Sequence, residues 1–196
     1  VCVTTQTWSP IGTCWCVPTY ANGGTSDIMT NITLGTLNNS TTGNVSPYYN
    51  DYTSLQQGSS ATLSIPNLFG GLTSNLVITY GIDPNQYGVV WIDFNHNGAF
   101  DASEYFSHNS NAGASGIATI SILTPGTAVG GITRMRIRGG DDVQMTDLQA
   151  CGATNSTWGE TEDYLVNIIP PVPKDPAITG LEGQSGNKIT TKEKVK

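Results

Sequence analysis

Segments in which apolar and polar residues alternate with a period of two recur along the chain, and this pattern constrains its fold most. In residues 132–138, for example, Thr133, Met135 and Ile137 alternate with three arginines. Alternate side chains of a strand face the same side of a sheet, so this pattern predicts strands with one buried face. We expect strands over residues 28–37, 61–65, 76–82, 89–94, 117–122, 132–138 and 164–169. Strands at this spacing, bounded by turn residues, predict an all-β, antiparallel β-sandwich of jelly-roll type.

Charge is distributed unevenly along the 196 residues. Residues 1–173 hold three arginines against twelve acidic residues, a formal charge of −9, whereas residues 174–196 hold five lysines against three acidic residues. Nucleic acid requires a cationic face, so the acidic body excludes it as a partner and favours cation binding. No apolar run reaches the roughly 18–20 residues that a transmembrane helix needs.

The sequence divides the chain into three parts. Residues 1–13 form an N-terminal extension, and the sandwich covers residues 14–169. The last strand should end at Ile169 because the following prolines lack the amide hydrogens that a strand donates. Residues 170–196 are expected to be a Pro-rich linker and basic tail. Alternatively, the tail is an intermolecular β segment in which residues 188–196 pair with the sheet edge of a neighbouring copy.

The four cysteines indicate disulfides and therefore an oxidising, extracellular compartment. Their spacing does not fit a zinc site, because one residue separates Cys14 from Cys16 and both histidines lie far away. Three pairings are possible. We favour Cys16–Cys151, which would tie the start of the domain to its end, together with Cys2–Cys14.

Residues 93–104 follow the pattern of an EF-hand-like calcium loop between strands. The expected ligands, at the first, third, fifth, seventh, ninth and twelfth positions, are Asp93, Asn95, Asn97, the Ala99 carbonyl, Asp101 and Glu104. Gly98 stands at the sixth position, where the chain must reverse. Phe100 should anchor the loop to the core. Calcium takes six to eight oxygens and suits this set, whereas magnesium needs a smaller octahedral cage. The alternative is a hairpin turn without an ion.

A second group of acidic residues lies near the arginine strand and the last strand. These residues either pair with the arginines or form a second acidic ion site; the site would comprise Asp141, Asp142, Glu160, Glu162 and Asp163, with Asp147 nearby. Paired carboxylates also hydrolyse glycosides, but nothing marks one of these as a buried acid in an aromatic cleft. Catalytic motifs are otherwise missing from the sequence, so we expect no enzymatic activity.

Tyr48, Tyr49 and Trp158 are candidates for stacking on a sugar ligand, although tyrosine and tryptophan are also ordinary core residues.

Several longer motifs together resemble the GEVED domain, a module of secreted and surface proteins of Bacteroidetes-type bacteria. The matching stretches are Cys16-Val-Pro-Thr-Tyr20, Tyr49-Asn-Asp-Tyr-Thr53, Val90 to Phe100 with Glu104, Arg134-Met-Arg-Ile-Arg138, Cys151-Gly152 and Trp158-Gly-Glu-Thr-Glu-Asp-Tyr164. Together they extend over about residues 14–169. The resemblance implies a β-sandwich accessory module of adhesins or secreted proteases, with no catalytic role.

Three functions are consistent with these observations. The first is a non-enzymatic, calcium-stabilised extracellular module that binds glycans or a cell surface. The second is a structural subunit of an extracellular filament, in which a terminal segment pairs with another copy. The third is the accessory domain of a secreted hydrolase. A module of this kind with only a short tail is expected to be either a fragment of a larger protein or a subunit that assembles with copies of itself.

Overall fold

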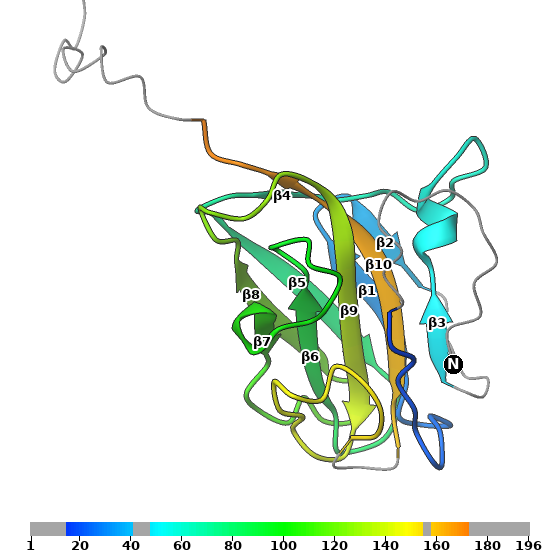
Figure 1. Cartoon of the computed structure of the whole chain (residues 1–196). Helices are drawn as coiled ribbons and strands as arrows, with labels where there is room; N and C mark the ends of the chain where they lie inside the picture. Colours follow the sequence, from blue (N-terminus) through cyan, green and yellow to red (C-terminus); the bar gives the residue numbers. More distant parts are fainter. Residues whose placement is uncertain (1–14, 41–47, 155–157, 173–196) are drawn as a thin grey trace, which may run out of the picture.

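The computed structural model describes residues 15–40, 48–154 and 158–172, which form two β-sheets packed face to face (Figure 1). One sheet has the order β2 (Leu37–Asn39), β1 (Met29–Leu34), β5 (Thr73–Tyr80), β8 (Ile117–Leu123). The other has the order β3 (Tyr49–Asp51), β10 (Glu160–Ile169), β9 (Gly131–Asp141), β6 (Tyr87–Ile92), β7 (Tyr105–Ser107), and β4 (Asn67–Phe69) also pairs with β10. Two short 3-10 helices, η1 (Thr53–Gln56) and η2 (Ala102–Glu104), complete the elements. The expectation of an all-β fold is confirmed.

The period-two pattern predicts the core between the sheets correctly. On β5 and β8 every second residue is buried, as a period of two predicts: Leu76, Ile78, Tyr80, Ala118, Ile120 and Ile122. Strand β6 is apolar on both faces: Val90 and Ile92 enter this core, while Val89 and Trp91 enter a second cluster on the outer face. Among the described residues, no helix has the length and apolar character needed to cross a membrane.

Three predicted strands differ from the structure. Residues 28–37, expected as one strand, contain β1, a turn at residues 35–36 and the first residue of β2. Residues 61–65 form no strand, because the amides of Thr62 and Leu63 bond to the carbonyl of Leu55 in η1 instead of to a neighbouring strand. Strand β4 begins after Pro66. Strand β5 ends at Tyr80, so Ile82, predicted to be in the strand, is 75% exposed.

The antiparallel expectation fails at one edge of β10. Strands β3 and β4 both run parallel to β10, β3 beside residues 161–163 and β4 beside residues 167–169. Between them, the Gln56 side chain takes the place of a strand: its amide accepts from Leu165 N (2.6 Å) and donates to Leu165 O (3.0 Å). The backbone of β10 therefore keeps its hydrogen bonds where no strand lies beside it.

Three arginines of β9 point away from the core, as predicted, yet two of them are fully buried. Arg136 is 0% exposed, and its Nε and Nη2 atoms each donate to the Asp163 carboxylate at 2.7 Å. Arg134 lies beside the same carboxylate (2.8 Å) and beside Asp51 (3.1 Å). Arg138 donates to backbone carbonyls, including Gln149 O at 2.7 Å. Since a buried charge is costly without partners, these bonds make the burial possible.

Aromatic rings cover Arg134, Arg136 and Arg138, which we call the arginine row. The guanidinium of Arg136 has Tyr49 at 5.4 Å and Phe100 at 5.0 Å, measured to the ring centroids. Trp15 lies 5.3 Å from the Arg134 guanidinium and Tyr20 lies 4.8 Å from that of Arg138. Cation–π contacts of this kind strengthen when water is excluded.

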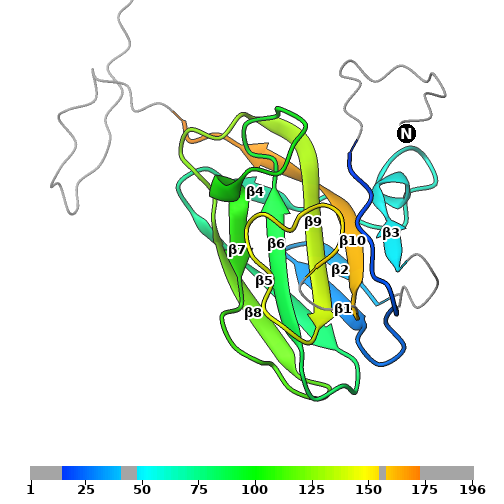
Figure 2. The same cartoon turned by 60° about the horizontal axis from the view of Figure 1, so that its bottom comes forward.

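Two segments that are distant in the sequence complete the cover of these arginines. Residues 15–20 and the loop after β9 pass over the outer face of the larger sheet (Figure 2). The disulfide Cys16–Cys151 joins them, which confirms this predicted pairing. Cys2 and Cys14 lie outside the described residues.

Removing the charge of Asp163 should destabilise the protein strongly. An Asp163→Asn variant leaves the buried Arg136 without a counter-charge, and we expect a loss of about 3–5 kcal/mol in the free energy of unfolding, measured by urea denaturation. The matched variant Asp51→Asn removes a partly exposed partner of Arg134 and should cost less than about 1 kcal/mol. Equal losses for the two variants would contradict the central position of the Arg136–Asp163 pair.

Candidate functional site

The candidate calcium loop connects β6 to η2 and β7. Asp93, its first residue, is 2% exposed, and its backbone is tied to β9: Asp93 N donates to Arg134 O (3.1 Å) and the Thr133 hydroxyl donates to Asp93 O (2.7 Å). Glu104, its last residue, is buried at the end of η2. The sheet thus holds both ends of the loop.

The loop reverses direction at residues with positive φ. Gly98 has a φ of 79° and His96 has a φ of 57°, a region that favours glycine. The reversal brings Asn97 N and Gly98 N within 3.1 and 3.0 Å of the two Asp93 carboxylate oxygens. Backbone amides therefore orient the first predicted ligand toward the inside of the loop.

Side chains from the third, fifth and ninth positions converge inside the loop. The amide nitrogens of Asn95 and Asn97 each donate to the same oxygen of Asp101 at 2.9 Å. The amide oxygens of Asn95 and Asn97 accept from Asn97 N and Ala99 N. Phe100 packs against the outer-face cluster, as its position in the loop predicts.

The carboxylate of Glu104 is held by backbone amides. Its Oε1 atom accepts from Phe94 N (2.8 Å) and Asn95 N (3.3 Å), and its Oε2 atom accepts from Asp101 N (3.0 Å). Burial raises the pKa of Glu104 above its ordinary value, and the amide bonds counteract only part of that shift.

The donor set of the loop fits a hard cation in its chemistry. Carboxylate and carboxamide oxygens from five side chains, together with the Ala99 carbonyl, are the ligands that calcium prefers. Oxygens that accept one hydrogen bond keep a second lone pair for an ion. In this structure the three carboxylates of the loop do not all lie within 4.8 Å of one another, so an ion would have to draw them together.

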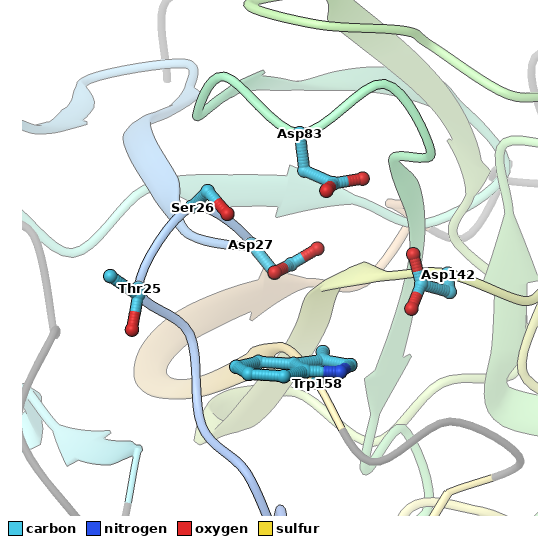
Figure 3. A pocket seen from close by; sticks show the side chains of 6 residues that line it. All are labelled: Thr25, Ser26, Asp27, Asp83, Asp142 and Trp158. Atoms are coloured by element: carbon cyan, nitrogen blue, oxygen red, sulfur yellow. The ribbon is translucent and has the colours of Figure 1, made fainter.

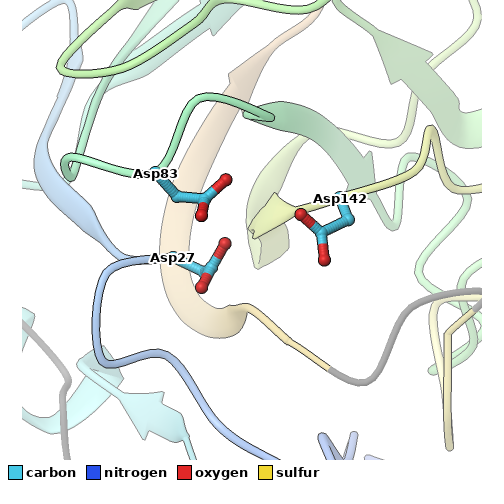
Figure 4. Close-up of side chains that lie close together, drawn as sticks. All are labelled: Asp27, Asp83 and Asp142. Carbon is cyan, nitrogen blue, oxygen red and sulfur yellow. The ribbon is translucent and has the colours of Figure 1, made fainter.

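A different acidic cluster does meet that distance within the described residues. Carboxylate oxygens of Asp27, Asp83 and Asp142 lie within 4.8 Å of one another (Figure 4). They line a pocket of about 360 Å³ together with Thr25, Ser26 and Trp158, whose indole forms one wall (Figure 3). The three carboxylates come from the segment before β1, the loop after β5 and the loop after β9.

Sequence reasoning included Asp142 but missed Asp27 and Asp83. The cluster forms because the loop after β5 bonds back to the segment before β1, with Gly81 N donating to Ile28 O (2.8 Å) and Asp83 N to Ser26 O (3.3 Å). No local sequence motif signals this long-range contact.

The predicted second acidic site does not form as one cluster. Asp163 belongs to the arginine row, Asp142 lines the pocket, and Glu160 and Glu162 point into the core from the opposite face of β10. Asp141 ends β9, but its side chain is outside the described part of the structure. The Asp147 backbone carbonyl accepts from the Trp91 indole.

Glu160 and Glu162 are two fully buried carboxyl groups on one strand face. Glu160 accepts from Met29 N and Glu162 accepts from the Tyr164 hydroxyl, both at 2.6 Å. Burial, and to a lesser degree the neighbouring Glu160, raises the pKa of Glu162 well above its ordinary value of 4.5. One carboxyl of the pair therefore keeps its proton at a pH where exposed glutamates are ionised.

The stability of the protein should accordingly fall as the pH rises from about 4.5. Over this range the unfolded chain has released the Glu162 proton while the folded protein retains it, so each step upward in pH favours unfolding. We expect Glu162→Gln to reduce this slope and to be more stable than wild type at neutral pH, measured by urea denaturation at a series of pH values. An unchanged slope in Glu162→Gln would contradict the assignment of the pH dependence to Glu162. The control is Asp147→Asn, outside the core, which should keep the wild-type slope.

The three candidate ligand aromatics lie in different environments. Tyr49 stacks on Arg136 and donates to Asp163 (2.8 Å), and burial raises its pKa. Tyr48 packs its ring against Gly23. Trp158 alone of the three lines the acidic pocket.

In a comparison with protein families, residues 87–167 match the family model of the GEVED domain. The match covers less than half of the chain and includes β6, the 93–104 loop, the arginine row and most of β10. It confirms the resemblance seen in the sequence motifs over these residues. The motif glycine, Gly159, has a φ of 127°, and a side chain there would collide with the Tyr20 ring and the Gly139 carbonyl. No curated protein matches the chain.

Proposed function

We propose that this chain is a non-enzymatic, calcium-stabilised extracellular module that adheres to glycans or another cell-surface ligand. The observation that carries the proposal is the 93–104 loop, whose oxygen ligands have the spacing of a calcium loop. The larger sheet holds one end through Asp93, which bonds to β9, and the other through β7, which follows Glu104 and pairs with β6. The Cys16–Cys151 disulfide supports an oxidising, extracellular location. The match to a β module of the GEVED type supports a binding role in place of a catalytic one.

Calcium would replace the internal hydrogen bonds of the loop. In this proposal Asp101, which now accepts from two asparagine amides, ligates the ion while those amides turn their oxygens inward. Glu104 completes the set through Oε2, which accepts a single amide bond and keeps one lone pair for the ion. The ion offsets the mutual repulsion of three carboxylates and lowers the pKa that burial has raised at Glu104. We expect a dissociation constant on the order of 10⁻⁶–10⁻³ M, as for sensor or extracellular modules.

Calcium should raise the melting temperature of the chelator-treated protein, because an ion that binds only the folded state stabilises it. At a hundredfold excess over the dissociation constant the gain is about 2.7 kcal/mol. Asp93→Asn and Glu104→Gln should abolish the response in a thermal melt followed by circular dichroism, whereas Asp147→Asn, outside the loop, should keep it. Magnesium at the same concentration should have a smaller effect.

A melting temperature that calcium does not change in the wild-type protein would refute the calcium-stabilised module. If calcium still raises the melting temperatures of Asp93→Asn and Glu104→Gln, the stabilising ion binds outside this loop.

The pocket beside Trp158 is our candidate for the adhesive surface. An indole face can stack on a sugar ring, and carboxylates can accept hydrogen bonds from sugar hydroxyls. The pocket combines one indole with three carboxylates and the side chains of Thr25 and Ser26. The other candidate aromatics, Tyr48 and Tyr49, pack against the protein itself.

Binding to a glycan array should therefore depend on Trp158. We expect Trp158→Ala to reduce binding roughly 5- to 140-fold, since stacking and burial of an aromatic side chain contribute about 1–3 kcal/mol. Leu148→Ala, which truncates an exposed apolar side chain elsewhere, is the matched control. Equal glycan binding by Trp158→Ala and Leu148→Ala would show that the pocket is not part of the adhesive surface.

A further inference from the structure

We propose that an ion in the 93–104 loop protects the Cys16–Cys151 disulfide from reduction, and that Phe100 couples the two sites. The inference rests on the calcium site proposed above and assigns to that site a regulatory role. It follows from contacts that join the loop to the disulfide across the outer face of the larger sheet.

Phe100 is the first link in this connection. It stands between Ala99 and Asp101, two of the candidate ligands, but its own ring leaves the loop and enters the outer-face cluster. There its centroid lies 4.6 Å from that of Trp15 and 5.0 Å from the Arg136 guanidinium. The ring therefore touches both the covering segment 15–20 and the arginine row beneath it.

Arg136 is the second link. Its Nη1 atom donates to Ala150 O at 2.9 Å and lies 3.1 Å from the Cys16 sulfur. Ala150 precedes Cys151, so one guanidinium contacts both segments that the disulfide joins. Trp15 precedes Cys16 in the same way. Two routes therefore lead from Phe100 to the disulfide, each through one intervening residue. One passes through Trp15 and the other through Arg136.

The disulfide is accessible to a reductant, since Cys16 is half-buried and Cys151 is exposed. Reduction breaks the sulfur–sulfur bond and leaves two thiols, while a dithiol such as dithiothreitol supplies the two electrons and two protons and closes to its own cyclic disulfide. The two covering segments would then be held only by contacts such as those of Phe100 and Arg136.

An ion that fixes Ala99 and Asp101 also fixes the backbone of Phe100 between them. The ring then loses less conformational freedom when it packs on Trp15 and Arg136, so the closed, disulfide-competent arrangement of the covering segments becomes more stable. Coupling between two equilibria is reciprocal: reduction must weaken calcium binding by the same factor by which calcium disfavours reduction.

The test measures the equilibrium constant for reduction in dithiothreitol buffers, with calcium and with chelator, well below the melting temperature. Labelling of Cys16 and Cys151 thiols, read by peptide mass, follows this disulfide separately from the other cysteines. We expect calcium to lower the constant about fivefold or more, the usual scale of coupling between sites. Phe100→Ala should lose this effect while its melting temperature still responds to calcium. Phe69→Ala, which truncates a 47% exposed ring on β4, is the matched control and should behave as wild type.

The outcomes separate this inference from the proposed function. If calcium raises the wild-type melting temperature but leaves the reduction constant unchanged, the coupling is refuted and the calcium site stands. If Phe100→Ala keeps the full effect on reduction, Phe100 is not the link and the inference is overturned. If neither the melting temperature nor the reduction constant responds, the calcium site and the coupling fail together.

A second measurement covers the case in which Phe100→Ala does not fold. The double variant Cys16→Ser/Cys151→Ser keeps Phe100 and mimics the reduced state. Its calcium dissociation constant, measured by calorimetry, should be raised by the same factor as the wild-type reduction constant changes. An unchanged dissociation constant would overturn the coupling.

Discussion

The buried ion pair between Arg136 and Asp163 is the constraint on which the larger sheet depends. A guanidinium with no exposed surface requires a counter-charge, hydrogen-bond acceptors and cover. Each requirement recruits a different part of the chain: β10 supplies Asp163, the loop after β9 supplies the Ala150 carbonyl, and Tyr49 and Phe100 supply the two ring faces. The outer face of this sheet is consequently a second core, and the disulfide fastens its cover.

Much of the fold could be predicted from alternation alone, because period-two burial is a local property of a strand. The arginines of β9 show the limit of that reasoning. Their outward direction was predicted correctly, but their burial depends on residues 15–20 and on the loop after β9, which tertiary contacts bring together. The parallel strands β3 and β4 were likewise missed, since pairing direction is set by the path of the chain and not by its pattern.

The candidate sites show the same division between local and long-range information. The pattern of the 93–104 loop could be recognised because its candidate ligands all lie within twelve consecutive residues. Asp27, Asp83 and Asp142 could not, because only the folded loops bring them together. Glu162 is an intermediate case: the alternation of Val166 and Tyr164, extended backwards along β10, already places it on the core face. The alternation in the sequence thus indicates burial of Glu162, but a charged residue is not normally expected in a core.

Direct measurement of bound calcium tests the central claim most simply. Equilibrium dialysis of the chelator-treated protein against radioactive calcium should show an ion bound to the wild-type chain and missing from Glu104→Gln, with binding retained in Asp147→Asn. No bound calcium in the wild-type protein at millimolar free ion would contradict the account, as would equal binding by wild type and Glu104→Gln.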